Sequence, residues 1–263
     1  MNYIDTHTHI DGEEFRADLD LVISRARESG ATKLFVPGIN ASSGEAIRSI
    51  CEKYPHYCYG MLGLHPEDVK SDWEAQLATI MQQSRDFPLI AVGEVGLDFY
   101  WSREYEEEQL MAFERQVEWA VESGMPLMIH CRKAQNELVR ILRKYDGRLH
   151  GGVFHCFTGN VHEAEELLAF DGFCLGIGGV LTFKKSNLPQ TLADAVPLDR
   201  IVLETDAPYM APVPRRGERN ESRYIIYVIE KLAEVYGVTP DEVANVTTGN
   251  VRRIFPSAFS RND

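Results

Sequence analysis

The chain has 263 residues, of which 44% are hydrophobic and 25% are charged, proportions that are ordinary for a globular protein. This composition excludes the collagen-like and disordered classes, and no apolar run reaches the length of a membrane span. The formal net charge is −13, so the chain is not expected to coat a long polyanion, and any contact with nucleic acid would be local.

The first residues of the chain show no secretion signal. Strand-like residues begin at Tyr3, with no basic segment or longer apolar stretch around them. The five cysteines are odd in number and lack CxxC spacing, which favours reduced thiols. We therefore expect a cytoplasmic protein.

Strand-like apolar runs alternate with helical patterns along the chain. The runs cover residues 3–10, 33–39, 58–64, 89–97, 126–131, 151–157, 173–179 and 201–206. Gly30 and Gly124 are predicted to end two of the intervening helices. After a proline-rich loop at 208–214, one helix is expected over about 223–236, and Thr239 is predicted to begin the last helix.

Eight strands separated by helices favour parallel pairing and closure. We predict a (β/α)8 TIM barrel of the metal-dependent hydrolase type, forming a single domain over residues 1–263. An open doubly wound sheet is the alternative.

Five of the predicted strands end in residues of the kind that bind metals. These residues are His7 and His9, Glu94, His130, His155, and Glu204 with Asp206. Imidazole and carboxylate without thiolate favour a catalytic divalent ion over a structural zinc site. Because parallel strands of a barrel end at the same mouth, closure would bring His9 and Asp206 together.

Several short motifs occur in an order that resembles the TatD family of metal-dependent hydrolases. They are Thr-His-Thr-His at 6–9, Gly-Leu-His-Pro at 63–66, Gly-Glu-Val-Gly-Leu-Asp at 93–98, His-Cys-Arg at 130–132, His-Cys-Phe-Thr-Gly at 155–159, Leu-Glu-Thr-Asp-Ala-Pro at 203–208 and Gly-Asn at 249–250. The resemblance covers essentially the whole chain. It implies a (β/α)8 barrel and phosphodiesterase activity, usually 3′-to-5′ exonuclease action on DNA and sometimes on RNA.

The resemblance also implies two divalent ions, which are Zn, Mg or Mn. By this comparison, the first ion is held by His7, His9 and Asp206. The second is held by His130 and His155, and Glu94 bridges the two. One departure from the family is visible at 214–222, where relatives often read Pro-His-Arg-Gly-Lys-Arg-Asn-Glu-Pro and this chain has Pro-Arg-Arg-Gly-Glu-Arg-Asn-Glu-Ser.

Acidic residues near the metal ligands are candidates for catalysis. Besides binding metal, Asp206 is predicted to take a proton from the nucleophilic water. Glu204 is predicted to orient a ligand, with a hydrogen bond to a backbone amide as the alternative. Cys131 and Cys156 each follow a ligand histidine, and strand alternation would turn both thiols into the layer between strand and helix.

The predicted loops after the strands contain candidates for substrate binding. His65 is predicted to donate to a substrate phosphate, and the alternative is a turn-stabilising role beside Pro66. Arg132 is predicted to bind phosphate at the rim, with a surface salt bridge as the alternative.

Three aromatic residues and an asparagine complete the candidates. Tyr100, Trp101 and Phe157 follow strands, where they would either stack a terminal base or pack in the core. Asn250 is expected to hold backbone near the mouth of the barrel.

The sequence thus favours a metal-dependent deoxyribonuclease that trims DNA or RNA from the 3′ end, with a monomer as the default state and no membrane partner. The alternative enzyme is a metal-dependent amidohydrolase or esterase, such as a lactonase or a D-aminoacyl-tRNA deacylase, because the fold alone does not choose the bond. A binding protein with a structural metal is a third hypothesis.

Overall fold

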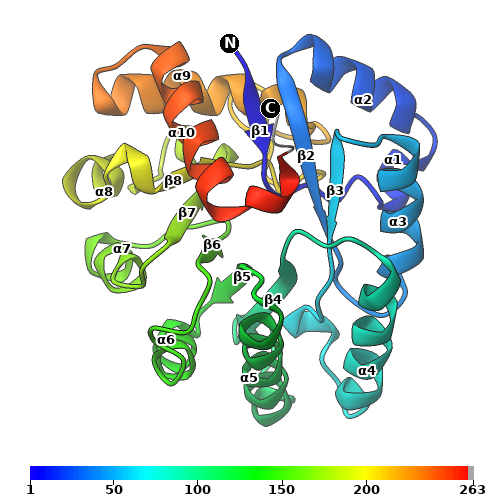
Figure 1. Ribbon diagram of the computed structural model, residues 1–263. Helices are drawn as coiled ribbons and strands as arrows, with labels where there is room; N and C mark the ends of the chain where they lie inside the picture. Colours follow the sequence, from blue (N-terminus) through cyan, green and yellow to red (C-terminus); the bar gives the residue numbers. More distant parts are fainter. Residues whose placement is uncertain (260–263) are drawn as a thin grey trace.

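The computed structural model describes residues 1–259, which form parallel strands surrounded by helices (Figure 1). The strands are β1 (Tyr3–Asp5), β2 (Ala31–Pro37), β3 (Cys58–Met61), β4 (Val92–Asp98), β5 (Leu127–Arg132), β6 (Gly152–Phe154), β7 (Phe173–Ile177) and β8 (Ile201–Leu203). The α-helices are α1 (Glu13–Arg16), α2 (Leu19–Glu28), α3 (Ser43–Lys53), α4 (Trp73–Gln83), α5 (Glu106–Ser123), α6 (Gln135–Arg143), α7 (Val161–Leu168), α8 (Leu188–Ala195), α9 (Ile225–Tyr236) and α10 (Pro240–Ile254). None of the helices in this part of the chain is long and apolar enough to cross a membrane.

The strands close into a barrel at two seams. Strands β1 to β3 pair in one parallel set, and strands β4 to β8 pair in another. A single parallel bridge between Thr8 and Ala207 joins the first strand region to the last, and one between Leu62 and Val92 joins the two sets on the other side. The predicted (β/α)8 barrel is therefore confirmed, and the open sheet is wrong.

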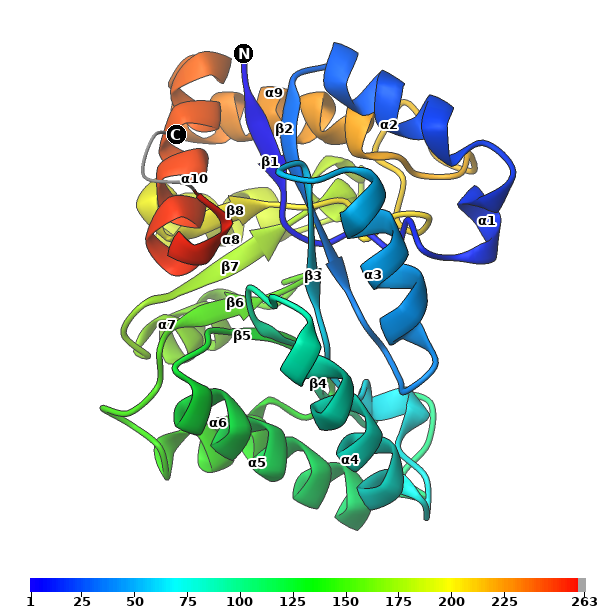
Figure 2. The same cartoon turned by 45° about the vertical axis from the view of Figure 1, so that its right-hand side comes forward.

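Two apolar layers pack against the strands, one on the outside of the barrel and one on the inside. One lies between strands and helices, and the other fills the interior with side chains from the opposite faces of the strands, among them Phe35, Met128 and Val202. Val251 and Phe255, at the end of α10, pack into the interior layer, and Figure 2 shows α10 beside β1 and β8. The interior is thus closed at the end where the strands begin, and a site can form only at the other end.

Several strands are shorter than the sequence predicted. β1 ends at Asp5, β6 at Phe154 and β8 at Leu203, because the backbone leaves the extended conformation beyond them. Cys156 and Asp206 adopt φ angles of 50° and 54°, which is the left-handed region. Most of the predicted metal ligands therefore lie on the bends just after the strands.

The predicted helix boundaries agree closely with the structure. Gly30 lies beyond the end of α2 with φ of 103°, and Gly124 ends α5 in the left-handed conformation. Thr239 caps α10 by accepting a hydrogen bond from the backbone N–H of Glu242. Short-range capping signals were thus sufficient to place these ends.

Candidate metal centre

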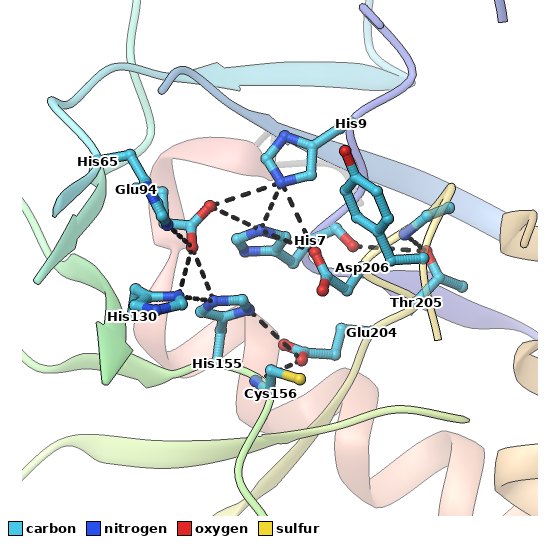
Figure 3. Close-up of polar contacts among 12 residues, drawn as sticks. His7, His9, His65, Glu94, His130, His155, Cys156, Glu204, Thr205 and Asp206 are labelled. Carbon is cyan, nitrogen blue, oxygen red and sulfur yellow. Dashed lines mark hydrogen bonds and ion pairs between the residues drawn. The ribbon is translucent and has the colours of Figure 1, made fainter. Parts of the chain in front are cut away.

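Glu94 lies at the centre of a cluster of histidines at the mouth of the barrel (Figure 3). Its side chain is buried in β4, where an irregular register between Val92 and Val95 changes the direction of the side chains. One carboxylate oxygen, Oε2, lies 3.2 Å from His7 Nε2 and 3.5 Å from His9 Nε2. These two histidines come from the bend after β1.

The other oxygen of Glu94, Oε1, faces a second set of histidines. It lies 3.1 Å from His130 Nδ1 at the end of β5 and 2.8 Å from His155 Nε2 just after β6. His65 Nε2 approaches the same oxygen at 3.2 Å. Each oxygen of one buried carboxylate therefore has its own group of imidazole nitrogens.

Asp206 lies on the far side of the first histidine pair. Its Oδ1 is 3.8 Å from His7 Nε2 and 3.6 Å from His9 Nε2. The backbone that carries it is fixed across the seam of the barrel, because Asp206 N–H donates to the carbonyl of His7 at 2.9 Å. The structure thus brings the first and last strand regions together at this point, as the sequence predicted.

Glu204 is turned differently from Asp206, although it lies only two residues before it. Its Oε1 accepts a hydrogen bond from the backbone N–H of Cys156 at 2.5 Å and lies 3.7 Å from His155 Nδ1. Gly176 on β7 leaves space for this carboxylate, since a Cβ there would lie 2.1 Å from Glu204 Oε2. Glu204 therefore supports the segment that carries His155 through a backbone amide, and its orientation of a metal ligand stays a prediction.

His65 makes two distinct contacts. Its Nδ1 accepts a hydrogen bond from the backbone N–H of Glu67 at the start of a short 3-10 helix, Pro66–Asp68. Its Nε2 therefore carries the ring proton and points it toward Glu94 Oε1. The turn-stabilising contact is present, and the remaining N–H points into the site.

Asp98 is a member of the site to which the sequence reasoning gave no role. Its Oδ2 accepts a hydrogen bond from His130 Nε2 at 2.9 Å, and its Oδ1 accepts one from the backbone N–H of Tyr100 at 2.8 Å. Burial opposes its ionisation, but the His130 hydrogen bond keeps the pKa of Asp98 below its ordinary value. The bond fixes the His130 tautomer that leaves Nδ1 free to face Glu94. The sequence did contain a signal for Asp98. It lies four residues after Glu94 on the same strand, so alternation places both side chains on one face.

The electrostatics of the cluster are dominated by the buried carboxylate. Burial alone would raise the pKa of Glu94, but His155 and the other histidines hold that pKa well below its ordinary value. Burial opposes a charge on His155, yet Glu94 raises its pKa well above the usual range. Glu94 also raises the pKa of His9, and the hydrogen bond to Asp98 together with Glu94 raises that of His130. Burial keeps the pKa of His7 low. The ionised carboxylate of Glu94 thus favours protonated histidines beside it, and a divalent cation would displace those protons.

The cluster has the donor set and the spacing of a metal site. The facing nitrogens of His7 and His9 are 3.2 Å apart, and so are those of His130 and His155. Two ligands of one tetrahedral zinc ion, each about 2.0–2.1 Å from it, would lie about 3.3 Å apart. Residues with metal-type atoms within 4.8 Å of one another include His7, His9 and Glu94 in one group, and His65, Glu94 and His130 in another.

The candidates for substrate contact are distributed around this cluster. The guanidinium of Arg132 lies 3.6 Å from the ring centre of Tyr100 and 5.2 Å from that of Trp101. The guanidinium also lies close enough to Asp98 for its charge to lower the pKa of that carboxylate, and the role of Arg132 stays a prediction. Tyr100 and Trp101 are exposed, whereas Phe157 is buried and packs in the core.

One prediction about a neighbouring residue is wrong. Asn250 does not lie near the mouth, because its Nδ2 donates to the carbonyls of Leu198 and Ile201, where β8 begins. The backbone at the mouth is held instead by Asn220, whose Nδ2 donates to the carbonyls of Thr205 and Tyr209.

The two cysteines that follow ligand histidines differ from each other. Cys131 packs beside the layer between strands and helices, as expected. Cys156 has left β6, and it borders a small cavity with Glu204 and Asp206. Strand alternation therefore does not describe Cys156.

Comparison with known proteins identifies the family. The sequence model described as "TatD related DNase" matches residues 4–256. The chain belongs to the TatD family. It is therefore a member of a family of metal-dependent hydrolases, and the sequence-based prediction of such an enzyme is confirmed.

Relatives in the TatD family match over almost their whole length. A Bacillus subtilis protein, described as the uncharacterized metal-dependent hydrolase YabD, is 36% identical over 251 residues, which are 95% of this chain and 98% of the relative. The Erwinia tasmaniensis protein described as the 3′-5′ ssDNA/RNA exonuclease TatD is 33% identical over 257 residues, covering 95% and 98%. The crystal structure of the TatD homologue YJJV from Escherichia coli aligns with a TM-score of 0.90 at 30% identity, covering 97% of this chain and 98% of that one.

Proposed function

We propose that this TatD-family hydrolase cleaves phosphodiester bonds and removes nucleotides from the 3′ end of single-stranded DNA or RNA. The observation that carries the proposal is the position of Glu94, whose two oxygens face two separate groups of histidines. That arrangement suits a carboxylate shared by two divalent ions. The relatives described as 3′-5′ ssDNA/RNA exonucleases support the choice of substrate.

The proposed ligands divide into two sets that share Glu94. His7, His9 and Asp206 would hold one ion, and His130 with His155 would hold the other. Divalent ions held by these residues would supply a water of lowered pKa and stabilise the negative charge of a phosphoryl displacement. The burial of Glu94 supports this assignment, since an ionised carboxylate in this position requires compensating positive charge.

Asp206 is the proposed proton acceptor. It lies beside His9 at the mouth, where the side chain is 18% exposed and a water can reach it. Burial raises the pKa of Asp206, although the neighbouring histidines oppose that increase. A carboxylate of raised pKa is better suited to accept a proton during the reaction than one of ordinary pKa.

Other residues would orient the ligands and the phosphate. Asp98 fixes the tautomer of His130, and Glu204 supports the backbone after His155, so both act through the ligands. The Nε2–H of His65 and the guanidinium edge of Arg132 are the proposed donors to phosphate oxygens.

The test uses purified protein with its metal content measured, and single strands labelled at the 5′ end. Stepwise shortening from the 3′ end, with no cutting of a circular strand, is the expected result. A panel of amides, neutral esters and lactones is assayed in parallel. Hydrolysis of that panel without strand shortening would overturn the proposal in favour of an amidohydrolase or esterase.

Two variants separate chemistry from recognition. Glu94→Gln removes the bridging charge with little change in shape, so metal content and turnover should both fall, the latter by several orders of magnitude. Arg132→Ala should keep its metal and lose one charge-assisted contact worth about 1.5–3 kcal/mol, which weakens phosphodiester turnover but spares a neutral ester. An equal loss of turnover on the phosphodiester and on the neutral ester would show that Arg132 does not bind the phosphate.

A further inference from the structure

An exposed aromatic group lies next to the metal centre. Trp101 is 68% exposed and Tyr100 is 50% exposed, and their rings meet edge to face with centres 4.8 Å apart. Both follow β4 directly, and Asp98 accepts the backbone N–H of Tyr100 while it also binds His130. The loop that carries the aromatic rings is thus tied to a proposed metal ligand.

A cavity of about 220 Å³ lies between this loop and the segment that follows His65. Its walls include Pro66, Asp98, Trp101 and Tyr105. A cavity of this size has room for several waters, and so for a planar heterocycle. Because Asp98 contacts His130, the cavity adjoins the metal centre.

The charges around the cavity favour an uncharged ring over a phosphate. Among the described residues, three carboxylates, those of Glu67, Asp98 and Glu104, line it together with a single cation, Lys70. Lys70 Nζ donates to the carbonyl of Glu67 and lies 5.4 Å from the ring centre of Tyr105. A phosphate would meet three carboxylates here, whereas the face of a base would meet aromatic walls.

Arg132 lies beside the aromatic pair, with its guanidinium 5.2 Å from the ring centre of Trp101. Its guanidinium face is stacked on Tyr100, and the N–H groups at the edge of the guanidinium point away from that ring and can donate to a phosphate. A nucleotide can therefore place its base against Trp101 and its phosphate toward Arg132 and the histidine cluster. Aromatic side chains and an arginine are a common combination in sites for single strands.

We propose that this cavity, with Trp101 as its stacking wall, binds a nucleobase of the strand whose phosphodiester bond is cleaved at the Glu94 cluster. This inference rests on the proposed nuclease function and adds a base-binding subsite to it. It concerns stacking and not the reading of base edges, so binding should tolerate every base.

The experiment compares Trp101→Ala with the unaltered enzyme on two oligonucleotides. One is an ordinary single strand, and the other has the same backbone with abasic nucleotides at its 3′ end. Leu21→Ala is the control, since Leu21 on α2 is 60% exposed but lies outside the cavity. Trp101→Phe tests whether an aromatic ring restores binding.

We expect Trp101→Ala to raise KM on the ordinary strand by about 5- to 150-fold, the range for loss of one stacked base, with kcat nearly unchanged. KM on the abasic strand should be equal in the two enzymes, and Trp101→Phe should recover most of the loss. An equal rise of KM on both strands, or no rise on either, would overturn the base-binding subsite.

A binding measurement distinguishes failure of the subsite from failure of the nuclease proposal. Titration with deoxynucleoside monophosphates should quench tryptophan fluorescence in the unaltered protein and not in Trp101→Ala, which retains Trp73 and Trp119. Quenching without strand cleavage would reject the nuclease and keep the subsite. Strand cleavage without quenching, and without the KM difference, would keep the nuclease and reject the subsite.

Discussion

Replacement of Asp98 by asparagine should weaken the binding of one of the two metal ions. The carboxylate accepts two N–H groups, from Tyr100 to Oδ1 and from His130 to Oδ2. An amide has one acceptor oxygen, so its NH₂ group must face one of these donors. If the NH₂ group faces His130, the ring proton of His130 moves to Nδ1 and blocks the nitrogen that faces Glu94. If the NH₂ group faces Tyr100, it points at the backbone N–H of Tyr100, and neither group has an acceptor.

The expected size follows from the role of this contact. Loss of a partner that orients a metal-binding histidine typically reduces metal affinity 10- to 100-fold, which is about 1.4–2.7 kcal/mol. Only the ion assigned to His130 and His155 should be affected. Calorimetric titration of the metal-free protein measures both sites, and Asp72→Asn, an exposed position on the surface, is the matched control. If both ions bind to Asp98→Asn within twofold of their normal affinity, the tautomer argument is refuted.

Three further predictions address the fold and its supports. Prolonged chelation should abolish hydrolysis and leave the helical circular dichroism signal nearly intact, since the interior is packed by strands and α10; global unfolding on chelation would contradict this. Gly176→Ala should place a Cβ against Glu204 and lower kcat at least about tenfold, and unchanged turnover would show that the position of Glu204 is unimportant. Asp18→Asn should destabilise the protein by about 1 kcal/mol at pH 7, after allowance for solvent screening of a side chain that is 28% exposed. The Arg219 hydrogen bonds lower the pKa of Asp18 to about 2, so this contribution is present above about pH 4 and is lost as pH falls through 2; urea unfolding at several pH values should show the difference between the proteins disappear near pH 2.

The sequence was informative wherever a residue type and a short spacing determined the outcome. Strand order, helix caps such as Thr239 and the convergence of the metal-type residues followed from patterns within a few residues of each other. The position of the site followed from the barrel, because all parallel strands of a barrel end at the same face. That is why His9 and Asp206 could be paired in advance although they lie at opposite ends of the chain.

The parts that could not be predicted depend on irregular backbone and on contacts between distant segments. Alternation places Glu204 and Asp206 on one face, but the left-handed φ of Asp206 separates them. Asp98 and Asn220 gain their roles from partners on other elements, and neither partner is visible in the local sequence. Asn250 was assigned to the wrong end of the barrel because its partners near β8 are about 50 residues away in the chain.

The seam between the first and last strand regions has a consequence for synthesis of the protein. Asp5 accepts hydrogen bonds from Thr205, a residue 200 positions later, and the same seam brings Asp206 to His7 and His9. A nascent chain that has not yet emerged from the ribosome as far as Asp206 lacks one wall of the proposed site. The complete set of proposed metal ligands is therefore assembled only after Asp206 has been synthesised, and polypeptides released before that point would lack the hydrolytic site.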